Sequence, residues 1–264
     1  MYKIPDELHS ANLCWSTPNG DNAIAWLARI SNPKNQEKMS QLELEGDTEK
    51  LKKMSAQLIN FCVDEEHWSI LQQGEMCVIV KTTLAIAPQI IRHTSFDIQQ
   101  FSLRYGQLDL SKESVEMPEL RLIDGKMRNP SVVGNLSDEL VEELYRSLSS
   151  SSDAYNLAMS NNIHPECARN FLPTATPTYI VLKGSCRTWF HYLNVRCAID
   201  AQGEHQKLAR SIRAIWAKEY PIVYKAWEMW RKKHFVMKTL YKMYSANELD
   251  LSEDQLIVIN SYTG

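Results

Sequence analysis

The 264-residue sequence predicts an α/β fold, in which strands and helices pack together. Two segments, near residues 75–94 and 179–220, each have the pattern of a strand, a short turn and a helix. Other stretches place apolar residues on one stripe of a helix. With 9 glycines and 10 prolines, the chain also has too few turn residues for an all-β protein.

The N-terminal quarter of the chain is predicted to hold two helices. Asp21 has the character of an N-cap, and apolar residues between Ala23 and Ile30 fall on one helical stripe that ends at Pro33. The polar residues 34–49 are predicted to form a loop. A second amphipathic helix is expected at residues 48–64, before a short polar segment.

Each strand-turn-helix unit begins with a β-branched segment, which is typical of a buried strand. The first unit has its strand at residues 75–84 and a short helix at 88–94. The second has its strand at 179–183, a turn at 184–185 and one long helix at 186–220. Both units therefore deliver Arg and His side chains just past a strand end.

The remaining segments complete the predicted domain. Residues 109–135 have a loop-like composition, whereas 137–161 have the apolar spacing of an amphipathic helix. Another helix is expected at 220–244. Because no linker-like segment divides the chain, residues 1–264 are predicted to form a single domain.

Composition excludes several classes of protein. Lys and Arg number 29 against 32 Asp and Glu, and a net charge of −3 disfavours a nucleic-acid partner. Neither GxGxxG nor GxxxxGK[ST] occurs, so any nucleotide must be held without a glycine-rich cradle. The six cysteines form no CxxC pair, which predicts a reduced, cytoplasmic protein without a metal site. No signal segment or run of 18 apolar residues predicts a membrane partner.

A donor-rich cluster follows the first predicted strand. Apolar residues alternate with its polar ones, which indicates that the segment is packed and that its polar groups need partners. Guanidinium groups bind phosphate through paired hydrogen bonds, and Gln and Ser can bind the carbonyl and imide edges of a heterocycle. The alternative is a solvated helix face with ordinary ion pairs. The polar members are Gln89, Arg92, His93, Thr94, Gln100, Ser102 and Arg104.

Two further clusters contain arginine. Arg169 precedes an apolar-Pro turn, where an ion pair is the alternative to a ligand contact. Arg187 and His191 are four residues apart and share a helical face. Arg196 lies five residues later, roughly 140° further round the helix. It would serve a different side of the site or a site shared with another subunit, or else form a salt bridge with a carboxylate that follows it.

Taken in order, these segments resemble the flavin-dependent thymidylate synthases, the ThyX family. The family signature is Arg-His-Arg, seven residues, Ser, one residue and Arg-Tyr. Here Arg92-His93-Thr94, residues 95–101, Ser102, Leu103 and Arg104-Tyr105 match it at every marker but one. Supporting matches span about residues 21–225. They are Ala28-Arg29-Ile30-Ser31, His67 with Ser69, Gln89, Ala168-Arg169 with Leu172-Pro173, and the series Arg187, His191, Arg196, Ala201-Gln202 and Glu204.

The resemblance implies the fold, the cofactors and the partners. The fold would be the α/β (α+β) thymidylate synthase complementing protein fold, a mixed sheet flanked by long helices. The assembly would be a homotetramer with active sites where subunits meet. FAD would be the cofactor and dUMP the substrate, with methylenetetrahydrofolate as carbon donor and NADPH as reductant of FAD. Residues 245–264 would be a C-terminal extension.

Site residues follow from the same match, position by position. The residues that match the family's dUMP positions are Gln89, Arg92, Gln100, Ser102, Leu103, Arg104, Arg169 and Arg196. Among them, Arg104 resembles a residue that binds the phosphate. The FAD positions match Ser69, Arg92, His93, Thr94, Gln100, Ser185, Arg187 and His191. His67 matches a position on the folate side.

The sequence departs from the family pattern at two flavin positions. Thr94 replaces the second Arg of the signature, and Ser185 stands where the family usually has Asn. Each lost charged hydrogen bond would weaken flavin binding by roughly 1–3 kcal/mol if nothing replaces it.

The activity that the resemblance implies is the reductive methylation of dUMP to dTMP. Arg196 is the expected catalytic residue, because a guanidinium stays charged and can stabilise negative charge on the uracil imide while C5 attacks. Ser102 would position the uracil. Two alternatives remain open. One is a family relative that modifies C5 of another pyrimidine nucleotide or transfers a hydroxymethyl group, and the other is a non-catalytic nucleotide-binding subunit.

Overall fold

A computed structural model describes residues 3–106, 115–123, 136–245, 252 and 255–258. The chain divides into two compact units, each assembled from separate stretches of sequence. Unit 1 comprises Met1–Trp15, Met76–Gly184 and Val195–Ile215, and unit 2 comprises Ser16–Glu75, Ser185–Asn194 and Trp216–Gly264.

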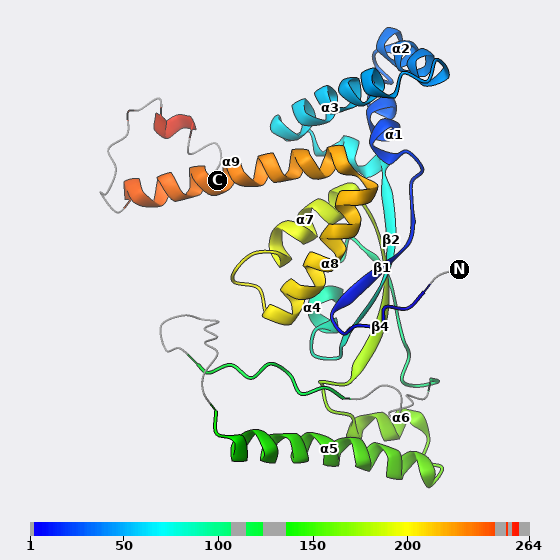
Figure 1. The fold of residues 1–264 in the computed structure, drawn as a ribbon, viewed down its shortest axis with the longest axis vertical. Coiled ribbons are helices and arrows are strands. Elements are labelled where there is room, and N and C mark those ends of the chain that lie inside the picture. The colour runs from blue at the N-terminus through cyan, green and yellow to red at the C-terminus, as the bar shows by residue number, and fades with distance from the viewer. Residues whose placement is uncertain (1–2, 107–114, 124–135, 246–251, 253–254, 259–264) are drawn as a thin grey trace. The chain divides into compact units, whose positions relative to one another are not determined.

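A four-stranded sheet has the strand order β1-β2-β4-β3 (Figure 1). The strands are β1 (Ser10–Ser16), β2 (Glu75–Thr83), β3 (Asp97–Gln100) and β4 (Pro177–Ser185). The α/β class and the strands of both predicted units are confirmed. The sheet is antiparallel rather than mixed. In β3 and β4, for example, Asp97 pairs with Lys183 and Gln100 with Ile180.

Unit 1 buries one face of helix α8 (Gly203–Glu219) and the short helix α4 (Ala87–Ile91). The backbone N–H of Ala11 in β1 donates to Ser211 Oγ of α8 at 3.0 Å, which fixes α8 beside the sheet. A second small core surrounds Tyr155, which is buried with Ala158 and Ala168. This core joins α5 (Asp138–Ser160), α6 (Pro165–Ala168) and the 3-10 turn η2 (Arg169–Phe171).

The prediction of α5 is confirmed, because Ser137 caps its first turn by accepting from the N–H of Leu140. Its apolar stripe is only partly buried, since Tyr155 is 2% exposed whereas Leu140 and Leu157 are 42% and 66% exposed. Among the described residues, none of the helices has the length and apolar character needed to cross a membrane.

Unit 2 is mainly helical. It contains α1 (Gly20–Leu27), α2 (Pro33–Leu44), α3 (Thr48–Asp64), the 3-10 helix η1 (Trp68–Gln73), most of α7 (Cys186–Arg196) and α9 (Pro221–Ser245). The predicted helix at 48–64 is confirmed. The predicted loop at 34–49 is wrong, because most of it is α2. Asn32 caps that helix and Pro33 is its first residue, while only Met39 and Leu42 are buried.

Asp21 caps a different helix from the one that the sequence predicted. Helix α1 begins after Asn19, which is in the left-handed region at φ 52°. The buried Asp21 carboxylate instead accepts from the backbone N–H groups of Ile222 and Val223, at 2.8 and 3.1 Å. It therefore satisfies two orphan donors in the first turn of α9.

Replacing Asp21 should change how stability depends on pH. Burial raises the pKa of the Asp21 carboxyl above its ordinary 3.8, more than the two N–H donors lower it. The folded state therefore favours the protonated acid. The contribution of this preference to the free energy of unfolding is complete below the unfolded pKa and is lost as pH rises through the raised folded pKa. Asp21→Asn keeps an acceptor and stays neutral. We expect the variant to gain unfolding temperature over wild type as pH increases from about 4 to 8. A pH-independent difference would contradict this expectation.

The predicted long helix at 186–220 is wrong, because it is broken into α7 and α8. Residues 197–202 form a turn, in which the N–H of Ala201 donates to the carbonyl of Ala198. The Gln206 side chain donates to the carbonyls of Ile199 and Ala201, at 3.2 and 2.7 Å. A side chain one turn into α8 thus satisfies backbone groups that a continuous helix would have paired.

Candidate nucleotide site

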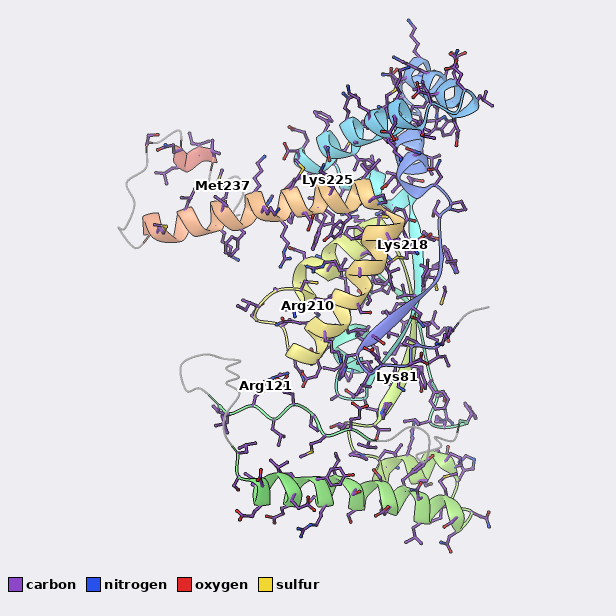
Figure 2. The ribbon with its side chains drawn as sticks, in the orientation of Figure 1. Lys81, Arg121, Arg210, Lys218, Lys225 and Met237 are labelled. Carbon is purple, nitrogen blue, oxygen red and sulfur yellow. The ribbon has the colours of Figure 1, made fainter. Side chains whose placement is uncertain are left out.

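A polar cavity of about 870 Å³ lies in unit 1, where α4, the end of α7, the 197–202 turn and the start of α8 meet. Three residues predicted to bind substrate line it: Gln89, Arg92 and Arg196. Arg121 contributes from the extended segment 115–123 (Figure 2). The other lining residues are Ala85, Pro88, Glu119, Ile199, Asp200, Ala201, Gln202, Gly203 and Gln206.

The guanidinium of Arg196 is held in place by two contacts at the C-terminal end of α7. Its Nε donates to His93 Nε2 at 2.8 Å, and its Nη2 donates to the carbonyl oxygen of Gln89 at 3.0 Å. Because the guanidinium only donates, His93 Nε2 carries no proton in this arrangement. Arg196 is half-buried, so its charge is less screened than that of a surface arginine.

The side chain of Gln89 belongs to a relay of hydrogen bonds that starts at the buried His205. His205 Nδ1 lies 3.2 Å from Gln89 Oε1, and Gln89 Nε2 donates to Gln202 Oε1 at 2.6 Å. His205 is fully buried on the apolar face of α8. Burial, with the positive charge of Arg196, lowers the pKa of His205 to about 3, so its ring is neutral near neutral pH.

A carboxylate cluster holds the 115–123 segment beside the cavity. Arg121 Nη1 donates to Glu204 Oε2 at 3.3 Å, and Arg121 also pairs with Glu119. These two carboxylates raise the pKa of Arg121. A Cβ on Gly203 would lie 2.4 Å from Arg121 Nη2, so glycine allows this close approach.

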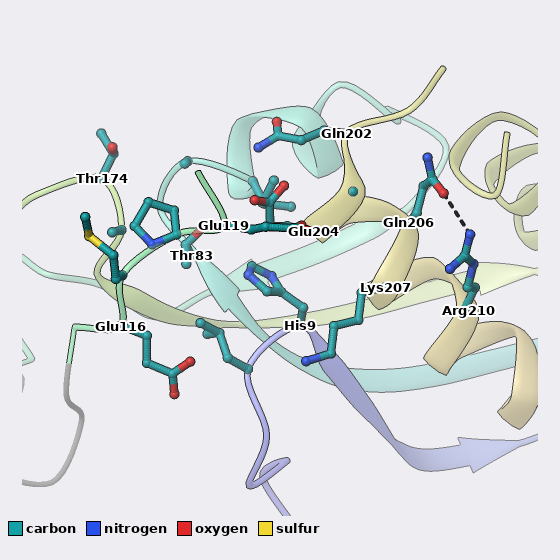
Figure 3. A pocket seen from close by; sticks show the side chains of 17 residues that line it. His9, Thr83, Glu116, Glu119, Thr174, Gln202, Glu204, Gln206, Lys207 and Arg210 are labelled. Atoms are coloured by element: carbon teal, nitrogen blue, oxygen red, sulfur yellow. Dashed lines mark hydrogen bonds between the residues drawn. The ribbon is translucent and has the colours of Figure 1, made fainter. Parts of the chain in front are cut away.

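A second cavity of about 560 Å³ adjoins the first and shares Ala85, Glu119 and Gln202 among its lining residues (Figure 3). His9 enters it from the segment before β1, with its Nδ1 3.1 Å from Thr82 Oγ1. Its backbone is in the left-handed region at φ 58°, which is uncommon for a residue other than glycine. Burial lowers the pKa of His9, so its ring is mostly neutral at neutral pH.

The other predicted substrate residues lie at a separate place in unit 1, and none of them lines the 870 Å³ cavity. Leu103 packs on the Tyr155 core, which leaves its neighbours Ser102 and Arg104 exposed. Arg104 lies 3.7 Å from the Glu166 carboxylate, and Arg169 Nε donates to the Glu166 carbonyl at 3.3 Å. The substrate positions therefore form two clusters within one chain.

Gln100 is at the end of β3, where its side chain donates to Thr178 Oγ1 at 3.4 Å. Its strand neighbour Asp97 pairs with Lys183 at 2.7 Å, so part of this segment has the ordinary ion pair that the sequence left open. Thr94 is exposed in the turn after α4. Arg92 lines the cavity, and His93 and Thr94 come directly after it in the chain. Together with Gln100 of β3, they are the flavin positions of unit 1.

Unit 2 carries the other flavin positions. On α7, Arg187 and His191 are exposed on one face, while Trp189, Tyr192 and Leu193 are fully buried. Ser185 Oγ accepts from the N–H of Thr188 at 3.3 Å and caps this helix. Ser69 and His67 are exposed near η1, with the His67 ring 6.1 Å from that of Phe61. The exposed guanidinium and imidazole donors on α7 suit a phosphate-bearing cofactor such as FAD.

Two residues of the site were missed by sequence reasoning. Arg121 falls in a segment whose sequence has no regular pattern, so nothing in the sequence indicates its place. The sequence does contain an indication of His205, because this single histidine lies on the apolar stripe of a predicted helix, directly after Glu204. Buried histidines need a polar partner, and Gln89 provides it.

Comparison with known proteins identifies the family. A family model described as "Thymidylate synthase complementing protein" matches residues 12–222. The chain belongs to this family. The resemblance read from the signature is thereby confirmed.

Two family relatives show the extent of the match. The flavin-dependent thymidylate synthase of Synechocystis sp. is 37% identical over 213 residues, which cover 79% of this chain and 89% of the relative. The probable flavin-dependent thymidylate synthase of Paramecium bursaria Chlorella virus 1 is 34% identical over 212 residues, covering 78% and 89%.

A solved structure shares the family fold. The UMP/dUMP methylase PolB from Streptomyces cacaoi, crystallised with 5-Br UMP, aligns with a TM-score of 0.63 at 19% identity. The alignment covers 82% of this chain and 92% of that structure. At this identity the likeness concerns the fold.

Proposed function

We propose that this chain catalyses the flavin-dependent reductive methylation of dUMP to dTMP. The observation that carries the proposal is the 870 Å³ cavity, which gathers Gln89, Arg92 and Arg196 in a chain of this family. Two guanidinium groups and an amide match the needs of a ligand with a phosphate and a carbonyl-rich ring. The names of its relatives, flavin-dependent thymidylate synthases, point to the same chemistry.

The chain's own residues bind and orient the pyrimidine. Arg196 is held by His93 and Gln89, so its charge is preorganised before the substrate arrives. It stabilises negative charge on the uracil imide as C5 attacks the one-carbon unit. Ser102 positions the ring, and Arg104 and Arg169 bind the phosphate.

FAD is held by the residues at the family's flavin positions, which are Ser69, Arg92, His93, Thr94, Gln100, Ser185, Arg187 and His191. The exposed donors on α7 support this assignment, because no described hydrogen bond or ion pair neutralises the Arg187 guanidinium. When bound, FAD supplies the reducing electrons, which NADPH replaces, while methylenetetrahydrofolate supplies the carbon. His67 lies on the folate side. Because one family match runs over residues 12–222, we treat residues 1–264 as one functional domain.

The active site is completed by a neighbouring subunit in a homotetramer. The separation of the substrate positions into two clusters supports this assembly, since Ser102, Arg104 and Arg169 do not line the cavity of their own chain. A second copy can present its Arg104 cluster to that cavity. None of the six cysteines forms a disulfide, which fits a reducing cytoplasmic location.

The absorbance spectrum of the purified protein and its tritium release test the function. We expect flavin bands after incubation with FAD, and tritium release from dUMP labelled at C5 when methylenetetrahydrofolate and NADPH are present. A product mass equal to dTMP distinguishes methyl from hydroxymethyl transfer. A spectrum without flavin bands, or release from another pyrimidine nucleotide but not from dUMP, would overturn the proposal.

A further inference from the structure

The relay behind the cavity has a direction that its atoms define. The amide Oε1 of Gln89 can only accept, so the neighbouring Nδ1 of His205 is the donor. Gln89 Nε2 then donates to Gln202 Oε1. His205 therefore donates a hydrogen bond to Gln89, and Gln89 donates one to Gln202.

This direction decides which groups face the ligand. Each amide oxygen of the relay already accepts one hydrogen bond, whereas Gln89 Nε2 has a second N–H and Gln202 Nε2 has two, with no partner among the described residues. Gln89 and Gln202 line the 870 Å³ cavity and His205 does not. The pair thus offers the cavity N–H donors, and a rotation of the Gln89 amide by 180° would offer an acceptor instead.

We propose that His205 is a positioning residue that fixes the Gln89 amide with its N–H edge toward the cavity, so that the site selects a uracil over a cytosine nucleotide. This inference rests on the proposed function, because it takes a pyrimidine nucleotide as the ligand. Uracil has a carbonyl acceptor at C4, where cytosine has an amino donor. A fixed N–H donor pairs with the first and repels the second.

Because the His205 ring is neutral, the direction of the relay's hydrogen bonds is fixed. A neutral imidazole has one N–H, and the bond to Gln89 assigns it to Nδ1. Because burial beside Arg196 and His93 lowers the pKa of His205 to about 3, no second proton competes near neutral pH. The histidine acts from behind the wall, and its effect on the ligand passes entirely through Gln89.

The role of His205 can be tested by measuring the affinities for dUMP and dCMP by calorimetry, for wild type and three variants. We expect wild type to prefer dUMP by about 100-fold or more. His205→Leu removes the donor and should reduce this preference at least about tenfold, a loss of about one hydrogen bond. In His205→Asn the side-chain Nδ2 occupies nearly the place of Nδ1, so the preference should be kept. His205→Gln places its amide at the far nitrogen and should lose it.

The Asn and Gln variants form a matched pair if the Leu variant does not fold. A preference unchanged in the Leu or Gln variant overturns the inference, as does a loss in a folded Asn variant. Nitrogen-15 NMR of labelled histidine gives a test that needs no nucleotide, because the proton of His205 must lie on Nδ1. A proton on Nε2 overturns the inference and leaves the proposed function standing. A wild-type protein that binds neither nucleotide overturns the proposed function, and this inference with it.

Discussion

Arg196→Ala should lose turnover by about 10²–10³-fold while the protein keeps its flavin. The guanidinium lines the cavity and is preorganised by His93 and Gln89, and an alanine would leave the developing imide charge unpaired. Flavin should remain bound, because Arg196 is not one of the flavin positions. Tritium release from dUMP measures turnover, and the flavin absorbance measures cofactor content.

A matched control is Arg146→Ala. Arg146 is exposed on α5, where it pairs with Glu142 one helical turn away, and such surface pairs contribute little. Its loss should leave turnover unchanged. If Arg196→Ala retained wild-type turnover, its assigned role would be wrong.

Mixing variants extends this prediction to the shared site. Arg104→Ala should also be inactive on its own, because the phosphate would lose its anchor. If one subunit provides Arg196 and another Arg104, random reassembly of both variants restores native sites in roughly one quarter of cases. Recovery of about that share of activity is expected. Two variants that stay inactive when mixed would place both arginines in the same subunit's site.

Gly20→Ala should destabilise unit 2 by about 1–3 kcal/mol. A Cβ at this position would lie 2.2 Å from Cε1 of Tyr220, whose ring is fully buried. The ring cannot move aside freely, because its hydroxyl donates to the Glu75 carbonyl at 2.6 Å and accepts from the N–H of Thr17 at 3.2 Å. The gain of up to about 1 kcal/mol from replacing glycine in a helix is smaller than this cost.

Gly203→Ala is the matched comparison for Gly20→Ala. Its Cβ would meet only the end of the flexible Arg121 side chain, so roughly 0.5 kcal/mol or less should be lost. Urea unfolding midpoints measure both variants. Equal midpoints for Gly20→Ala and wild type would contradict the packing argument.

The helices and strands with strong local patterns were predictable from sequence, and those that depend on distant partners were not. Helix α3 has a clear apolar stripe, so its bounds were predicted correctly, and in the structure Asp47 caps its first turn. Helix α2 buries only two residues, and a polar segment of that kind has little periodicity to detect. Strand β3 is four residues long and forms only by pairing with β4, nearly eighty residues later along the chain.

The same distinction applies to the candidate site. Arg92 could be identified because it opens the family signature, and Arg196 because it belongs to the ordered series of supporting matches. The division of the substrate positions into two clusters could not, since it depends on Leu103 packing on the Tyr155 core. Asp21 shows the limit most clearly. Its residue type predicted a cap, but its partners lie about two hundred positions away, at the start of α9.

The family match ends near the start of helix α9, whereas the buried core of unit 2 continues further along this helix. The family match ends at residue 222, yet Val223, Ala226 and Trp227 are buried just beyond it, and α9 packs against α3. A protein trimmed to the shared family region would therefore expose the interior of unit 2. The matched range therefore ends inside a hydrophobic core, and the helix that completes this core lies almost wholly beyond the match.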